Sequence, residues 1–188
     1  GVQAIPALLD GPWQGETDGG GLSSVACGRA HTLVVSGSGR LYSFGENDNA
    51  QLGHSAGGPF GRPMRAGGSL AGLQVERAWA SPLCDVSFAR ASSESGQPTY
   101  LQWGRLPGSD ETWPVPEEVV ELRGLDVQTI TAGPAHCLAL LASGDVFTWG
   151  SSAETEAAAE ATTGIGALGL QLLGPVRVPR RHPALDQY

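Results

Sequence analysis

Residues 25–35 read Val-Ala-Cys-Gly-Arg-Ala-His-Thr-Leu-Val-Val, and residues 130–140 read Ile-Thr-Ala-Gly-Pro-Ala-His-Cys-Leu-Ala-Leu. Each stretch leads into a second pattern, Ser-Gly-Arg-Leu-Tyr-Ser-Phe-Gly at residues 38–45 and Ser-Gly-Asp-Val-Phe-Thr-Trp-Gly at residues 143–150. In both copies one glycine lies three residues before the histidine, and two more lie eight and fourteen residues after it. Four positions kept at the same spacing indicate an internal repeat, which decides the fold before any local structure is considered.

The residues shared by the two copies are expected to be structural. They are Gly28, His31, Gly39, Gly45, Gly133, His136, Gly144 and Gly150. We expect each histidine to be half-buried behind a glycine turn, where its imidazole ties down the backbone of a neighbouring strand. Replacing His136 with alanine should therefore lower stability without abolishing a reaction.

A weaker copy lies between these two. The stretch Ala-Trp-Ala-Ser-Pro-Leu-Cys at residues 78–84 places Ser81 in the glycine slot and Cys84 in the histidine slot. With this register the period is 53 and then 52 residues. The closing Trp-Gly ends at Gly104, twenty residues after Cys84 instead of fourteen, so six extra residues are expected in a long hairpin around residues 92–98.

Each copy predicts short strands joined by turns. Runs such as Leu-Val-Val at residues 33–35 are typical of buried strands, and aromatic β-formers precede the last glycine of each copy. The chain has 28 glycines and 13 prolines with 40% hydrophobic residues, which favours an all-β fold with many turns. Four short strands in about 50 residues is the size of one β-propeller blade.

The pattern resembles the RCC1 repeat, in which Val-x-x-Gly-x-x-His-Thr is followed by Gly-x-Val-Tyr-x-Trp-Gly and then by Gln-Leu-Gly. Residues 51–53 supply Gln-Leu-Gly in the first copy, and Ala-Leu-Gly at residues 167–169 is a degenerate version in the third. The resemblance implies an all-β propeller of RCC1-type repeats with about three to four blades present. Because such propellers usually close with about seven blades, we expect either a fragment of a longer chain or a partial propeller completed by another polypeptide.

The expected organisation follows from the repeat period. It comprises the end of a preceding repeat or a linker at residues 1–22, an RCC1-like repeat at 23–74, a degenerate one at 75–127, a third at 128–180, and a tail at 181–188.

Charge and cysteine content narrow the class of function. With 11 basic against 19 acidic residues the net charge is −8, so direct nucleic-acid binding through phosphates is not expected. Three widely spaced cysteines, Cys27, Cys84 and Cys137, form no disulfide framework and predict an intracellular protein, cytoplasmic or nuclear, with the mitochondrion left open. Because no apolar run reaches the roughly 20 residues of a membrane helix, no membrane partner is expected.

Catalytic and metal-binding motifs are absent from the sequence. Cys27 and His31 have the spacing of a ligand pair, but no second pair follows at metal spacing, so no metal is expected. There is no Gly-x-Ser-x-Gly nucleophile motif, phosphate loop or dinucleotide fingerprint. The sequence therefore predicts neither an enzyme nor a bound cofactor.

These exclusions leave a protein-interaction scaffold, in which the propeller presents loops to a partner protein in a larger complex. The candidate partner-binding residues are polar or acidic side chains of the predicted loops, namely Glu46, Asn47, Asp48, Asn49, Glu94, Asp145, Glu154 and Glu156.

The family resemblance implies one alternative, guanine-nucleotide exchange on a Ran-like small GTPase. In exchange-active members, acidic or histidine residues at or just before the repeat histidine face the GTPase. The slot before the histidine is here assigned to Ala30, Leu83 and Ala135, none of which is acidic. Exchange is therefore the less favoured hypothesis.

Overall fold

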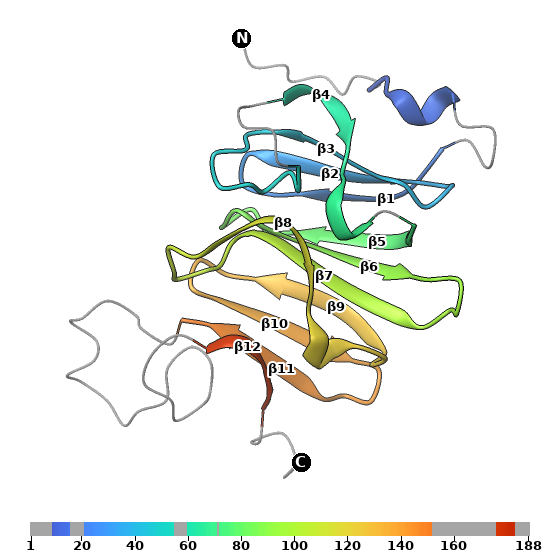
Figure 1. The fold of residues 1–188 in the computed structure, drawn as a ribbon. Helices are drawn as coiled ribbons and strands as arrows, with labels where there is room; N and C mark the ends of the chain where they lie inside the picture. The colour runs from blue at the N-terminus through green and yellow to red at the C-terminus, as the bar shows by residue number, and fades with distance from the viewer. Residues whose placement is uncertain (1–8, 16–20, 55–59, 71, 152–175, 183–188) are drawn as a thin grey trace.

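A computed structural model describes residues 9–15, 21–54, 60–70, 72–151 and 176–182. These residues form three four-stranded antiparallel sheets, in each of which consecutive strands pair (Figure 1). The first sheet contains β1 (Leu22–Cys27), β2 (His31–Ser36), β3 (Leu41–Gly45) and β4 (Phe60–Arg65). The second contains β5 (Gln74–Ala80), β6 (Val86–Ser92), β7 (Pro98–Arg105) and β8 (Thr112–Glu118), and the third β9 (Val127–Ala132), β10 (His136–Leu141), β11 (Val146–Gly150) and β12 (Val176–Arg181).

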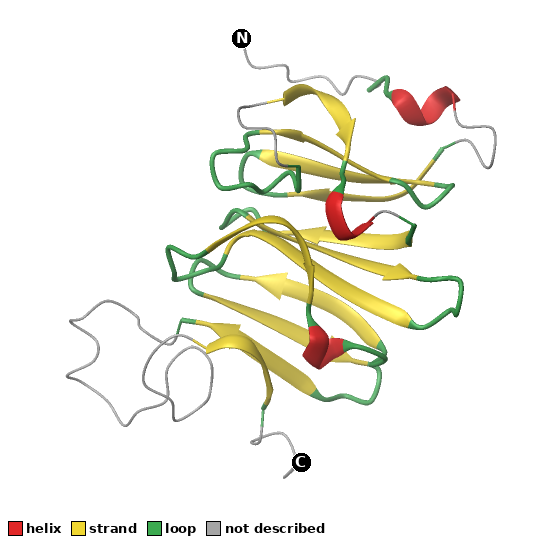
Figure 2. Ribbon diagram, in the orientation of Figure 1, coloured by secondary structure: helices red, strands yellow, loops and turns green. Residues whose placement is uncertain are grey.

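Among the described residues, the remaining regular structure is three short 3-10 turns, η1 (Pro12–Gly15), η2 (Gly68–Leu70) and η3 (Val120–Leu122) (Figure 2). Within the ranges given above there is no α-helix, and no helix long and apolar enough to cross a membrane. The predicted all-β fold of propeller blades, present as a partial propeller, is confirmed.

The hydrophobic cores lie between the sheets, as in a propeller. Because alternate residues of a strand point to opposite faces, the middle sheet contributes to two cores. On one face Ala89 and Trp103 join the core that holds Leu33 of the first sheet. On the other face Phe88 meets Trp149 of the third sheet, edge to face, with 5.8 Å between the ring centroids. The three blades are therefore stacked face to face.

The outer face of the first sheet is covered by the segment that precedes it. Trp13 on η1 is only 4% exposed and packs with Val34 and Tyr42, while half-buried Phe44 borders the cluster. The rings of Trp13 and Tyr42 meet edge to face at 5.9 Å. Both faces of the first sheet are thus packed, one by the second sheet and one by this tryptophan.

Connections alternate between two ends of the stack, because consecutive strands run antiparallel. The turns before β2, β6 and β10 lie at one end, together with the described residues that directly follow β3, β7 and β11, and we call this end the loop end. The hairpins at residues 37–40, 93–97 and 142–145 lie at the opposite end, the hairpin end.

One backbone crossing at the loop end recurs in all three sheets. In each sheet, a glycine at or next to the end of the third strand has positive φ and pairs with the first residue of the second strand. The amide of the residue after this glycine donates a hydrogen bond to the carbonyl of the residue just before the second strand. The donors and acceptors are Glu46 to Ala30 (2.9 Å), Arg105 to Asp85 (3.1 Å) and Ser151 to Ala135 (2.7 Å). A Cβ on these glycines would lie between 2.1 and 2.6 Å from the same carbonyl oxygens, so only glycine fits.

This crossing corrects the predicted register of the middle repeat. Gly104 pairs with Val86, so Val86 and not Cys84 occupies the histidine slot, and Asp85 and not Leu83 occupies the slot before it. The turn before β6 spans residues 81–85, two more than the equivalent turns, and the remaining four extra residues lengthen β6 and β7. The spacing gives only the total of six extra residues and does not show how many lie in the turn and how many in the strands. The expectation that all six lie in the hairpin was therefore wrong.

Candidate functional site

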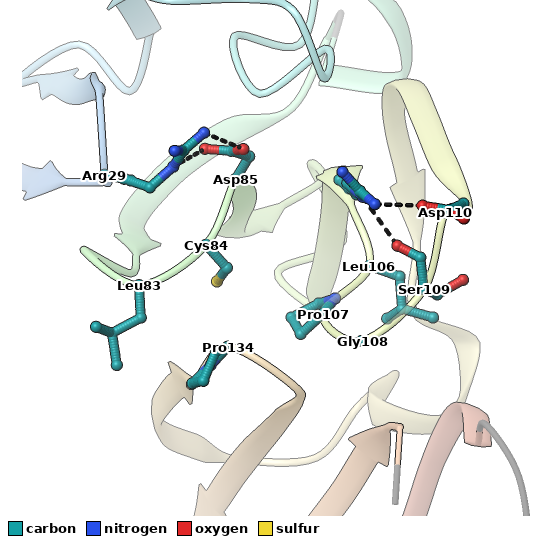
Figure 3. Close-up of a pocket in the computed structure, with 11 residues that line it drawn as sticks. Arg29, Leu83, Cys84, Asp85, Leu106, Pro107, Gly108, Ser109, Asp110 and Pro134 are labelled. Atoms are coloured by element: carbon teal, nitrogen blue, oxygen red, sulfur yellow. Dashed lines mark hydrogen bonds and ion pairs between the residues drawn. The ribbon is translucent and has the colours of Figure 1, made fainter. Parts of the chain in front are cut away.

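A buried carboxylate joins the first two sheets at the loop end. Arg29, in the turn before β2, donates from Nε to Asp85 Oδ1 at 3.1 Å and from Nη2 to Oδ2 at 2.9 Å (Figure 3). Asn49, in the connection after β3, donates from Nδ2 to Asp85 Oδ2 at 2.9 Å. The Asp85 side chain is 8% exposed and that of Arg29 is 55% exposed. The acid is therefore enclosed, whereas part of the guanidinium faces solvent.

The environment of Asp85 keeps this carboxylate ionised. Burial alone raises its pKa, but the hydrogen bonds and charge of Arg29, together with the Asn49 amide, outweigh burial and leave the pKa below its ordinary value. Both carboxylate oxygens are consequently engaged by side chains of this chain.

A second polar contact between the same sheets involves the first repeat histidine. His31 is buried, and its Nε2 lies 2.8 Å from the Ser87 hydroxyl of β6. Ser87 donates its proton to the Gln51 carbonyl at 2.8 Å, and Trp103 Nε1 donates to the same carbonyl at 2.9 Å. Burial lowers the pKa of His31 to about 4, so the ring is neutral at physiological pH.

The expected backbone tie of the repeat histidines takes a different form in the structure. His31 binds a hydroxyl group of the next sheet, and that hydroxyl in turn binds the backbone. His136 is half-buried, and its ring makes no hydrogen bond to another residue of the described ranges. The reason given for a stability loss at His136 thus applies to His31 instead.

A pocket of about 520 Å³ opens at the loop end beside the Arg29–Asp85 pair. Residues of all three sheets line it, including Leu83 and Asp85 before β6, residues 105–110 at the end of β7 and after it, and Pro134 before β10. Figure 3 shows the Arg29–Asp85 pair on one side of this hollow, with Leu83 and Pro134 on another. Its volume lies in the range typical of ligand-binding sites, about 300–1,000 Å³.

The predicted loop residues at this end have two different roles. Glu46 and Asp48 are exposed after β3. Asn47 is buried and accepts a hydrogen bond from the Leu52 amide at 3.0 Å, and Asn49 holds Asp85. The two asparagines therefore shape the connection, and the two acids face solvent.

Two other predicted loop residues, Glu94 and Asp145, do not join this site. Glu94 and Asp145 lie at the hairpin end, on the opposite side of the stack. Asp145 accepts hydrogen bonds from Arg181 at 2.8 Å and Ser143 at 2.8 Å, which tie the third hairpin to β12. Glu154 and Glu156 lie outside the described residues. The six candidates that the structure describes therefore do not form one surface.

The described residues offer little for catalysis or metal binding. Within those ranges, no group of three or more His, Cys, Asp or Glu side chains could hold a metal ion. Burial raises the pKa of the Cys84 and Cys137 thiols, so they stay protonated and poorly nucleophilic. The pocket instead provides charged side chains around a concave surface.

Sequence reasoning missed Arg29, Asp85, Leu83 and Arg105 as site residues. For three of them the sequence held a signal, which was their position next to the recurring crossing. Arg29 directly precedes Ala30, Asp85 is the equivalent of Ala30 in the middle repeat, and Arg105 follows Gly104. A correct register for the middle repeat would have placed these opposite charges together.

Comparison with known proteins agrees with the three-sheet fold. The family model of the regulator of chromosome condensation (RCC1) repeat matches residues 22–51 and 127–154, in the first and third sheets. The E3 ubiquitin-protein ligase HERC2 of Mus musculus is 31% identical over 80% of this chain and 3% of that protein. The mitochondrial RCC1 domain-containing protein RUG3 of Arabidopsis thaliana is 29% identical over 97% of this chain and 39% of that protein.

Among solved structures, Prp20p from Saccharomyces cerevisiae superposes with a TM-score of 0.61 at 21% identity, covering 92% of this chain and 40% of Prp20p. The chain thus spans well under two thirds of the length of these relatives. Repeat matches, relatives and fold together identify an RCC1-like repeat protein.

Proposed function

We propose that this RCC1-like repeat protein is a protein-interaction scaffold that binds its partner at the loop end. The observation that carries the proposal is the pocket, to which connections from all three sheets contribute. Binding residues are commonly placed on loops that a rigid β-scaffold holds in position. The other candidate surface, the hairpin end, includes the predicted residues Glu94 and Asp145.

The rigidity of the loop end supports a binding role. The Arg29–Asp85 pair and the contacts of Ser87 and Trp103 with Gln51 connect the first two sheets beside the pocket. A surface fixed before binding loses less conformational entropy when a partner docks. Leu83 at the pocket edge is 60% exposed, and an exposed apolar side chain next to a hollow suits a partner contact.

The alternative is guanine-nucleotide exchange on a Ran-like small GTPase. The corrected register favours it in one respect, because the slot before the repeat histidine holds an acid, Asp85, in the middle sheet. The structural relative Prp20p has binding properties toward Gsp1p and histones. Against exchange by this chain, both oxygens of Asp85 are engaged by Arg29 and Asn49.

The scaffold proposal is tested with a photo-crosslinking residue placed at Leu83, or at Glu94 as the matched control on the hairpin end. Each variant is expressed in the native source, irradiated, and analysed by mass spectrometry. We expect a protein partner crosslinked from position 83 and not from position 94. Equal crosslinking from both positions, or none from position 83, would reject the loop end as the binding surface.

Exchange is tested separately by release of fluorescent GDP from a Ran-type GTPase. We expect no acceleration by this protein, because Asp85 is already paired. Faster release that depends on Asp85 would replace the scaffold proposal with the exchange hypothesis. We infer an intracellular location, in the cytoplasm or nucleus with the mitochondrion left open, which fractionation of the native source would test.

A further inference from the structure

Resting on the proposed function, we propose that the pocket at the loop end recognises an acidic side chain next to an apolar one on an extended segment of the partner protein. Two arginines, Arg29 and Arg105, line the pocket and supply donors for the acid. Leu83 and Pro134 supply the apolar surface beside them.

Both guanidinium groups are held by acceptors of this chain along one edge only. Arg29 uses Nε and Nη2 for Asp85. Arg105 donates from Nε to the Ser109 carbonyl at 2.9 Å and from Nη2 to the Asp110 carboxylate. The Nη1 amino group of each arginine donates to none of the described residues. Each side chain is therefore oriented in advance and keeps donors for a further acceptor.

The two aspartates beside these arginines leave room for an additional carboxylate. Asp85 is enclosed and offers no unengaged oxygen. Asp110 is 96% exposed, so its attraction to Arg105 is weakened by solvent, and an incoming carboxylate can share that guanidinium. A planar carboxylate matches the planar donor pair of arginine better than other groups of a protein partner do.

The apolar part of the pocket identifies the neighbour of that acid. Leu83 is 60% exposed, Pro134 is also exposed, and both border the same hollow as Arg29. An isolated anion would leave this surface uncovered. An extended peptide places alternate side chains on the same face, so an apolar residue two positions from the acid can reach it.

The experiment selects binders from a displayed library of random peptides on the intact protein and measures synthetic copies of the selected peptides by fluorescence anisotropy. We expect selected peptides to carry Asp or Glu close to Leu, Ile or Phe. Arg105→Gln and Leu83→Ser alter exposed side chains, and each should weaken binding about tenfold, the loss expected for one charge-assisted contact or one apolar contact. Arg62→Gln, on exposed β4 outside the pocket, is the matched control and should bind normally.

Arg29→Gln is left as a secondary variant because it also removes the partner of a buried carboxylate. Selection of basic peptides, or of acidic peptides whose affinity does not change with Arg105→Gln and Leu83→Ser, would overturn the inference. Failure to select any peptide would also overturn it. In each of these cases crosslinking from position 83 still reports on the scaffold proposal, so the two failures are distinguishable.

Discussion

Replacing His31 with valine should remove a specific part of the acid sensitivity of the fold. Ser87 donates its only hydroxyl proton to the Gln51 carbonyl, so it must accept the bond from His31, and the ring carries its proton on Nε2. The other nitrogen, Nδ1, is buried and has no partner within the described ranges. Protonation would therefore place an unpaired charge in the interface between two sheets.

The size and sign of the effect follow from the pKa of His31, which burial lowers from 6.5 to about 4. Between these values the unfolded chain binds a proton that the folded chain does not, so stability is complete above about pH 6.5 and falls as the pH decreases toward 4. The full loss corresponds to at most about 3 kcal/mol. Valine is chosen because Val86 occupies the same slot in the middle sheet.

Urea unfolding followed by tryptophan fluorescence at several pH values between 7 and 4 measures this effect. At pH 7 the His31→Val variant should be less stable by about 1 kcal/mol, since it loses one hydrogen bond. The difference should shrink or reverse toward pH 4. His136→Val is the control. It should lose stability at low pH as the natural chain does, because His31 is intact. Parallel pH profiles for the natural chain and His31→Val would refute this account.

Three further substitutions test other contacts by the same unfolding assay. Gly28→Ala should cost about 1–3 kcal/mol because its Cβ would lie 2.0 Å from the repeat histidine ring, whereas Gly133→Ala, with 3.7 Å to its nearest neighbour, should cost much less. Trp13→Ala should cost about 3 kcal/mol and increase binding of a hydrophobic dye, because it uncovers the outer face of the first sheet. Asp85→Asn should lower the free energy of unfolding by about 1–3 kcal/mol at pH 7. This difference should disappear as the pH falls through the lowered pKa of Asp85. An unchanged difference at low pH would show that the charge of Asp85 does not strengthen its contact with Arg29.

The sequence predicted the fold well because the fold depends on a repeated local pattern. Gly45 and Gly150 cannot be replaced at their backbone crossing, so they keep the spacing that made the repeat visible. The middle repeat was misaligned because Cys84 resembled a substitute for histidine, whereas its slot is filled by Val86. A two-residue insertion in a turn together with a four-residue extension of two strands adds the same six residues as one longer hairpin loop. Only the strand pairing distinguishes these two possibilities.

The candidate site was harder to predict because it depends on contacts between repeats. Asn47 and Asn49 were expected to bind a partner, yet they hold their own connection and the next sheet. The pairing of Arg29 with Asp85 joins residues 56 positions apart, and no local pattern reports it. Periodicity finds positions that are alike, whereas this site consists of the residues by which the repeats differ.

The recurring crossing at the loop end has a consequence for protein engineering. At Ala30, Asp85 and Ala135 the crossing itself uses only the backbone carbonyl, which accepts a hydrogen bond from the amide after each glycine. The side chain at this position is therefore free to vary without loss of the crossing, as the two alanines and one aspartate illustrate. Randomising Ala30 and Ala135 would introduce new chemical groups next in sequence to the pocket-lining residues Arg29 and Pro134, so the same scaffold could be redirected to different targets.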